Sequence, residues 1–197
     1  MKKTLSIVSA ILIGISSVNF LLIPIQYDDR INELRKENDN LVAIQRDALN
    51  FLIKANSQKE LQSVLNDHMD ILKLFYRDLN YLKKKEHFII IAARSAAIYA
   101  VDACLSVKNI TEIESDSILN NLGNMSDLDQ LREIYSKYAE TASNGTIIIE
   151  KQIRDNQQKT DELISNRDCH RYISLFIQSL GLIFGIIAIG MKDISKQ

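Results

Sequence analysis

Proline, glycine and tryptophan are scarce in this sequence, which has one proline, six glycines and no tryptophan among its 197 residues. A β-sandwich or a β-barrel needs many tight turns, and such turns depend on glycine and proline, so both architectures are excluded. Collagen-like and low-complexity classes are excluded for the same reason. The composition instead favours long helices with few interruptions.

Cysteine is also scarce, because the chain contains only Cys104 and Cys169. Two cysteines in a chain of this length do not make a disulfide framework. A bridge between them remains an alternative, but two buried free thiols are the favoured interpretation.

Neither sign of charge predominates: 24 basic residues face 25 acidic ones, and the net charge is −1. Acidic residues slightly outnumber basic ones between the two apolar segments described next, whereas a general nucleic-acid surface needs the opposite balance. We therefore expect no direct nucleic-acid binding. Apolar residues make up 46% of the chain, enough for one domain with a hydrophobic core.

Two uncharged apolar segments lie near the two ends of the sequence, at Leu5–Ile25 and Tyr172–Gly190. Each has about 20 residues, which as a helix crosses the roughly 30 Å hydrocarbon layer of a membrane. The basic start Met1-Lys2-Lys3 is also typical of a cleaved signal peptide. The apolar run continues past any plausible cleavage point, however, and no A-x-A site follows it, so an uncleaved anchor is favoured. The sequence predicts a tail (1–4), a transmembrane helix (5–25), a central domain (26–171), a second transmembrane helix (172–190) and a tail (191–197).

Basic residues near these segments weakly indicate which side of the membrane holds the central domain. Six flank the segments in the central domain and four in the tails: Arg30, Arg35, Lys36, Lys159, Arg167 and Arg171 against Lys2, Lys3, Lys192 and Lys196. The positive-inside rule then favours a cytoplasmic central domain. The basic pair at the start of the chain favours the opposite side, because the flanks of a first helix often dominate.

The periodicity of the central domain is helical throughout, which predicts an all-α fold: an antiparallel helical bundle or coiled coil. A first helix follows the membrane segment, and a capping box at 57–60 begins the next one. After that box, spacings of four and three alternate in a packing seam: Leu61, Leu65, His68, Leu72, Phe75, Leu79 and Leu82. Residues 88–107 are apolar nearly all round. We interpret them as a buried helix rather than a third membrane span, because Arg94 and Asp102 are costly in lipid.

Two arrangements of the central domain remain open. A capping box at 111–114 begins a short helix that ends near Gly123, and Ser126 caps the next. If Asn144-Gly145 is a turn, residues 26–55, 58–88, 111–142 and 146–171 form a four-helix bundle. Without that turn, residues 58–105 and 126–171 form one longer antiparallel pair.

The sequence offers almost no catalytic chemistry. No glycine-rich phosphate loop, H-E-x-x-H, C-x-x-C or G-x-S-x-G pattern occurs, so we expect no catalytic residue, metal site or cofactor. Two polar residues fall on predicted helix seams. His68 suggests either a tolerated edge residue or a proton-sensitive switch. Asn38 suggests either a surface residue or one that fixes helix register.

Small residues recur along both membrane segments. They follow spacings of four and three in the first, at Ser6, Ala10, Gly14 and Ser17. In the second, Ser174, Gly181 and Gly185 share such a stripe with Gln178, whose amide adds a polar group that needs a partner. Such stripes let helix backbones approach closely in lipid. They either pack the two segments of one chain together or line an oligomer interface or a polar path through the bilayer.

A helical domain between two membrane segments with these stripes resembles the two-transmembrane effectors of bacterial anti-phage systems, including the retron-associated ones. The resemblance covers the whole chain as architecture, and no functional residue carries over from it. It implies a toxic protein of the bacterial inner membrane that forms homo-oligomers in the lipid bilayer. It also implies control by a cytosolic regulatory protein or ribonucleoprotein. The alternative functions are a sensor or scaffold with an extracytoplasmic four-helix bundle and, least favoured, an enzyme.

Overall fold

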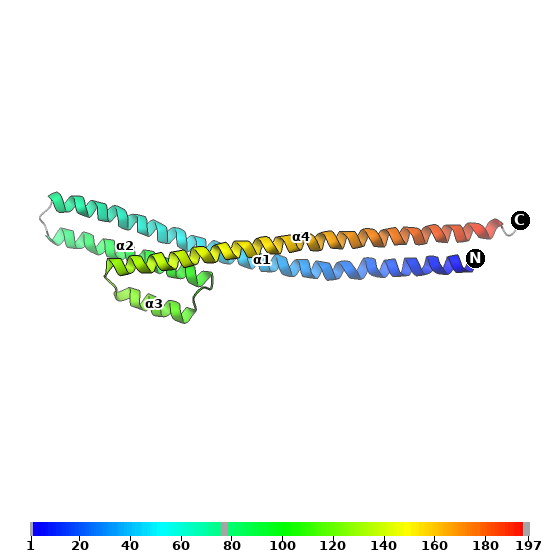
Figure 1. The fold of residues 1–197 in the computed structure, drawn as a ribbon, viewed down its shortest axis with the longest axis horizontal. Helices are drawn as coiled ribbons and strands as arrows, with labels where there is room; N and C mark the ends of the chain where they lie inside the picture. Colours follow the sequence, from blue (N-terminus) through cyan, green and yellow to red (C-terminus); the bar gives the residue numbers. More distant parts are fainter. Residues whose placement is uncertain (1, 76–78, 195–197) are drawn as a thin grey trace. The chain divides into compact units, whose positions relative to one another are not determined.

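The computed structural model describes residues 2–75 and 79–194 of the chain. These residues form four α-helices and no strand, so the predicted all-α fold is confirmed (Figure 1). The helices are α1 (Lys2–Phe75), α2 (Leu79–Ser106), α3 (Glu112–Asn124) and α4 (Leu128–Ile194).

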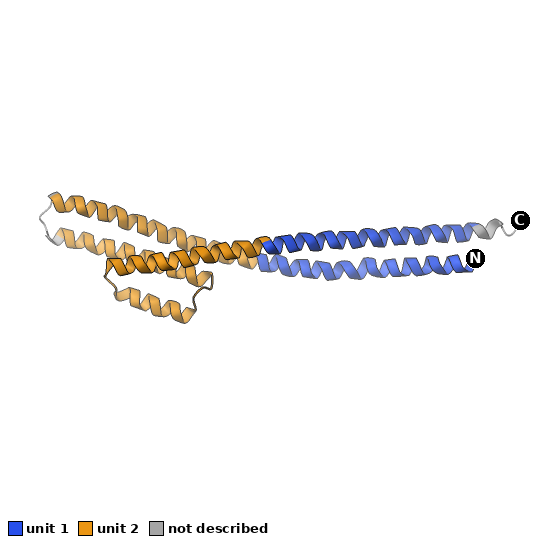
Figure 2. Ribbon diagram, viewed as in Figure 1, with its two compact units in different colours: residues 1–38, 155–197 blue, residues 39–154 orange. Residues whose placement is uncertain are grey.

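The chain divides into two compact units, which Figure 2 colours separately. Unit 1 comprises residues 1–38 and 155–197 and is an antiparallel hairpin of the first part of α1 and the last part of α4. Unit 2 comprises residues 39–154 and contains the rest of α1 and α4 together with α2 and α3. Unit 1 therefore includes both apolar segments and the helical stretches that flank them.

The capping box predicted at residues 57–60 is not used, because α1 runs through it without a break. The hydroxyl of Ser57 donates to the carbonyl of Ile53, 3.0 Å away, which is a bond made inside a continuing helix. The prediction of a new helix at residue 58 is therefore wrong, and so is the four-helix arrangement that depended on it.

The capping box at residues 111–114 is confirmed. Thr111 is the N-cap of α3: its hydroxyl accepts from the backbone N–H of Glu114, and the Glu114 carboxylate accepts from the backbone N–H of Thr111 at 2.8 Å. The start of α4 differs from the prediction by one residue. Asp127, rather than Ser126, accepts from the backbone N–H groups of Asp129 and Gln130.

The Asn144-Gly145 pair is not a turn, since α4 continues through it. Gly145 instead allows a close approach from the segment after α2. A Cβ at this position would lie 2.7 Å from both the Asn109 amide nitrogen and the Val107 Cγ2 atom. The long-pair arrangement is closer to the structure, but its first member is also wrong, because α2 begins only at Leu79.

The core of unit 2 is built around the alanine-rich face of α2. Alanine removes the side-chain bulk that would otherwise separate helices, so α1, α3 and α4 all reach this face. Leu122 of α3 and Leu131 of α4 are fully buried against it. The residues of this cluster are Ala55, Ala93, Ala96, Ala97, Ala100, Val101, Leu122, Leu131 and Tyr135.

The leucine seam predicted after residue 61 does not coincide with the buried face of α1. Leu61 is 46% exposed, whereas Gln62 and Met69 are only 5% and 4% exposed. His68 is exposed as well, which fits an edge residue rather than a histidine packed inside the seam. The side chains of Phe75 and Leu79 lie outside the described residues.

Candidate membrane interface

Unit 1 carries large apolar side chains that its two helices do not cover. Monomeric soluble proteins rarely expose apolar patches of this extent, so such a surface indicates lipid or a protein partner. The exposed residues on the first segment are Ile7, Val8, Ile11, Ile15, Val18, Phe20, Leu21, Leu22 and Ile25. Those on the second are Tyr172, Ile173, Leu175, Phe176, Leu182, Ile183, Ile186, Ile187 and Ile189.

Small residues seven positions apart form the contact between α1 and α4 in unit 1. On α1, Ser9 and Ser16 are buried one heptad apart. On α4, Ser174, Gly181 and Ala188 are buried at the same interval, and Gly181 lies against Ile13 of α1. A seven-residue repeat keeps one face of each helix turned toward its partner, as in a left-handed coiled coil.

The two helices lie close together at Ser9. Its hydroxyl donates to the carbonyl of Gly181 at 2.7 Å, which is a buried bond between segments 172 residues apart in sequence. A Cβ at Gly181 would lie 3.3 Å from the backbone nitrogen of Ile13, and a Cβ at Gly185 would lie 3.0 Å from Ser9 Oγ. Gly181 thus maintains this spacing against the backbone of Ile13, whereas at Gly185 only the Ser9 side chain would have to yield. Close backbone contact supplemented by a hydroxyl bond is how helices associate in lipid.

The two predicted small-residue stripes lie on different sides of the hairpin. The second lies against α1, because Ser174 and Gly181 are buried and Gln178 and Gly185 are half-buried. The first lies mostly on the outside of the hairpin. Ser6, Ala10 and Gly14 are exposed, Ser17 is half-buried, and nothing lies within 4 Å of a Cβ built at Gly14.

The sequence interpretation missed Ser9 and Ser16, the residues of α1 that do face α4. The interval of seven between them was the available signal. It was hidden by the more conspicuous spacing of four among neighbouring small residues.

Ion pairs connect α1 and α4 just after the first apolar segment and just before the second. Arg167 Nη1 lies 2.7 Å from Asp28 Oδ1, and Arg167 Nε lies 3.1 Å from Asp168 Oδ1. These two hydrogen bonds raise the pKa of the Arg167 guanidinium above its ordinary value. Next to this group, the rings of Tyr27 and His170 are 5.8 Å apart. The apolar segments 5–25 and 172–190 are therefore in register, with a polar boundary at the same level on both helices.

Asn38, the second polar candidate, is half-buried in unit 1. Asn156 of α4, in the same unit, is 7% exposed and was not singled out from the sequence. A buried amide in a helix pair favours one register over others, because a slip would leave it among apolar groups.

The apolar helix α2 differs from the two segments of unit 1. Half of its most apolar stretch (50%) is buried within the protein, against 11% and 17% for the corresponding stretches of α1 and α4. Arg94 on α2 donates from Nη2 to the carbonyl of Met125, 2.7 Å away. This burial favours the interpretation of residues 88–107 as a core helix of unit 2.

The two thiols have different environments. Cys104 is buried and donates from Sγ to the carbonyl of Tyr138 at 2.9 Å, whereas Cys169 is exposed. Both are free, so the prediction of two buried thiols is correct for Cys104 and wrong for Cys169. Within the described part of the chain, no three His, Cys, Asp or Glu side chains are placed to hold a metal ion.

No family model matches the chain, and neither does any curated protein or any solved structure. Its class therefore follows from its own features. Over residues 2–75 and 79–194 it is all-α, and three helical stretches there, Lys3–Leu74, Tyr81–Ser106 and Leu128–Gly190, are long and apolar enough to cross a membrane.

Proposed function

We propose that this chain is a non-enzymatic integral membrane effector of bacteria. Residues 5–25 and 172–190 cross the inner membrane as a two-pass hairpin, and residues 26–171 lie on its cytoplasmic side. The observation that carries the proposal is the shared polar boundary at Asp28 and Arg167, 2.7 Å apart. Two apolar segments that end at one level match the single thickness of a bilayer.

In this proposal, hairpins assemble through the exposed stripe of α1. Ser174, Gly181 and Gly185 are already occupied by the contact within the chain, whereas Ser6, Ala10 and Gly14 are uncovered. An uncovered small-residue stripe lets a second helix approach closely in lipid. The stripe also brings the Ser6 hydroxyl to the outside of the hairpin, where it can hydrogen-bond to a neighbouring copy.

Assembly of several hairpins would perturb or permeabilise the membrane. An inhibitory partner bound to unit 2 would hold the protein inactive until a signal releases it, so the chain expressed without that partner would be active. A regulatory protein or ribonucleoprotein fills this role in the anti-phage effectors that the architecture resembles. Since α1 and α4 each run through both units, a change in unit 2 has a continuous helical path to the membrane hairpin.

The test is induced expression in bacteria with a dye that reports membrane potential. We expect the wild-type chain to depolarise the cells and Gly14→Leu to abolish the effect, because leucine blocks close approach at the stripe. Gly190→Leu is the matched control, since a Cβ there also meets nothing within 4 Å but lies on the other helix. Harmless expression of membrane-inserted wild-type protein would refute the proposal, as would equal effects of the two variants.

A sensor or scaffold module is the second candidate, and a cavity in unit 2, described below, favours it. The layout would then place residues 26–171 outside the cytoplasm. A reporter fused after Gln197 distinguishes the two, because both chain ends lie on one side of a two-pass protein. A cytoplasmic reporter supports the sensor, and an external one supports the effector.

A further inference from the structure

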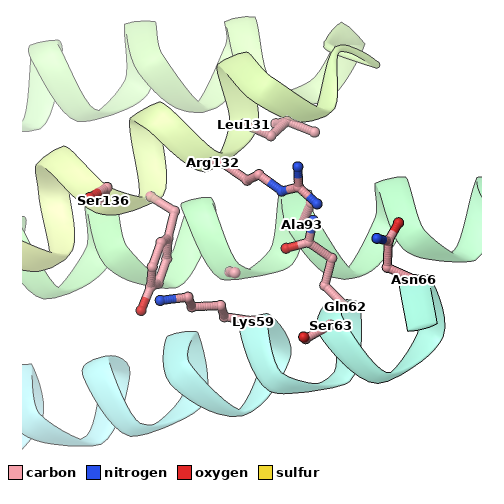
Figure 3. Close-up of a pocket in the computed structure, with 10 residues that line it drawn as sticks. Lys59, Gln62, Ser63, Asn66, Ala93, Leu131, Arg132 and Ser136 are labelled. Carbon is pink, nitrogen blue, oxygen red and sulfur yellow. The ribbon is translucent and has the colours of Figure 1, made fainter.

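Unit 2 contains a cavity of about 330 Å³ between α1, α2 and α4 (Figure 3). The volume is within the range of small-molecule sites. The floor of the cavity is apolar, formed by Ala93, Ala96 and Leu131, which are nearly or fully buried. Its remaining lining is polar and comes from α1 and α4: Lys59, Gln62, Ser63, Asn66, Arg132, Tyr135 and Ser136.

The guanidinium of Arg132 is held in place before any ligand arrives. Gln62 is only 5% exposed, and with its amide oxygen turned toward Arg132 it accepts from Nε at 3.0 Å and from Nη2 at 3.2 Å. Figure 3 shows this amide and the guanidinium pointing toward each other across the cavity. A buried amide that orients an arginine lowers the entropy cost of binding an anion there.

A second cation lies in the same cavity. Lys59 Nζ is 5.1 Å from the centre of the Tyr135 ring, and no carboxylate of the described residues forms an ion pair with it. Burial, supported by the charge of Glu60, raises the pKa of the Tyr135 hydroxyl. That hydroxyl therefore stays neutral and donates to Asn56. Two cations facing one polar cavity favour a dianion such as a phosphate group.

The uncharged lining indicates what the phosphate is attached to. Ser63 and Asn66 of α1 supply hydroxyl and amide groups that suit the hydroxyls of a sugar or polyol, whereas Ser136 lies at the other end of the cavity (Figure 3). A nucleobase would need an open aromatic face for stacking. The only ring in the lining, Tyr135, is 9% exposed and has Lys59 over it.

We propose that this cavity binds a small phosphorylated sugar or polyol, with its phosphate on Lys59 and Arg132 and its hydroxyls on Ser63 and Asn66. Arg132 already pairs with a carboxylate that competes with the phosphate, since Asp129 Oδ1 lies 3.3 Å from Arg132 Nη1. Since the Asp129 side chain is 92% exposed, its hold on the guanidinium is weak. The proposal concerns unit 2 alone and does not depend on what the membrane segments do.

The test is calorimetric titration of the full chain in non-ionic micelles with ribose 5-phosphate, ribose and inorganic phosphate. We expect ribose 5-phosphate to bind and each of the other two to bind at least tenfold more weakly. Arg132→Gln and Lys59→Gln should each weaken binding about ten- to hundredfold, because each removes charge-assisted hydrogen bonds. Absence of binding would overturn the proposal, and so would equal binding of inorganic phosphate.

Asp129→Asn gives a result that misfolding cannot imitate. Freeing Arg132 from its carboxylate should tighten binding about two- to fivefold, in line with the worth of an exposed ion pair. The matched control is Glu150→Gln, which frees Arg154 from a similar exposed pair (2.9 Å) outside the cavity. Equal changes in both variants would show a general effect of charge and overturn the proposal.

Discussion

Replacing Gly181 with alanine tests the close contact between α1 and α4 in unit 1. The added Cβ would lie 2.8 Å from Ile13 Cγ1 and 3.3 Å from the Ile13 backbone nitrogen. The side chain of Ile13 can rotate, but its backbone belongs to a helix and moves only if α1 moves. Overpacking of this kind costs about 1–3 kcal/mol, which lowers the ratio of paired to separated helices roughly 5- to 150-fold.

A disulfide between Ser9→Cys and Gly185→Cys reports the pairing. A Cβ built at Gly185 lies 3.9 Å from Ser9 Cβ, and bridged cysteines have Cβ atoms about 3.5–4.5 Å apart. The native thiols are removed first, by Cys104→Ala and Cys169→Ser. Increasing amounts of SDS in the micelles then separate the helices. A short oxidising pulse at each step measures the fraction of chains that still form the bridge.

At the SDS concentration where half of the reporter chains are paired, Gly181→Ala should leave roughly one-sixth or fewer paired. The control is Gly14→Ala, whose added Cβ meets nothing within 4 Å, and it should leave the curve unchanged. Equal shifts in the two variants would refute the packing argument. Bridges found only between different chains would refute the hairpin itself.

Two further predictions concern unit 2 and are measured by thermal unfolding followed by circular dichroism. Gly145→Ala should lower the free energy of unfolding by about 1–3 kcal/mol, because the new Cβ would lie 2.7 Å from Val107 Cγ2. Gly123→Ala should raise the free energy of unfolding by about 0.5–1 kcal/mol, because its new Cβ meets nothing within 4 Å. Changes of the same sign would contradict this contrast. Thr111→Ala should cost about 1 kcal/mol through loss of the cap. Hydrogen bonds from Thr111 lower the pKa of Glu114 below its ordinary 4.5, so the stabilisation is present above that pH and is lost as pH falls through the lower value. The stability difference between wild type and Glu114→Gln should therefore fade in acid. A difference independent of pH would show that the ionised Glu114 carboxylate does not stabilise the cap.

Helix content and the α3 cap were predictable because both depend on residues close together in sequence. Thr111 and Glu114 satisfy each other's backbone groups within one turn, wherever the rest of the chain lies. The similar box at Ser57 failed for a tertiary reason. Ala55 and Gln62, on either side of it, are buried in unit 2, and their packing keeps α1 helical through the box.

Which face of a helix is buried was less predictable, because the partner helix decides it. Leu61 and Leu65 belong to a regular apolar pattern, yet the face of α1 that contains Gln62 and Met69 is the more deeply buried. Similarly, Gly145 looked like a helix breaker, and only the nearby Val107 shows that it serves a close contact. No local pattern could have indicated the cavity at Arg132, whose lining comes from three helices.

The small residues at the contact between α1 and α4 in unit 1 recur every seven positions, and this repeat bears on how the two helices are aligned along their axes. Ser9 would meet another small residue, Ser174 or Ala188, if α4 slid by one heptad, which is a shift of about 10.5 Å. Either residue would also bring a Cβ into the place of Gly181, against the backbone of Ile13, so packing disfavours both slips. The ion pair between Asp28 and Arg167 also opposes these slips. The residues seven positions from Arg167 on α4 are Thr160 and Ser174, and neither carries a charge with which Asp28 could pair.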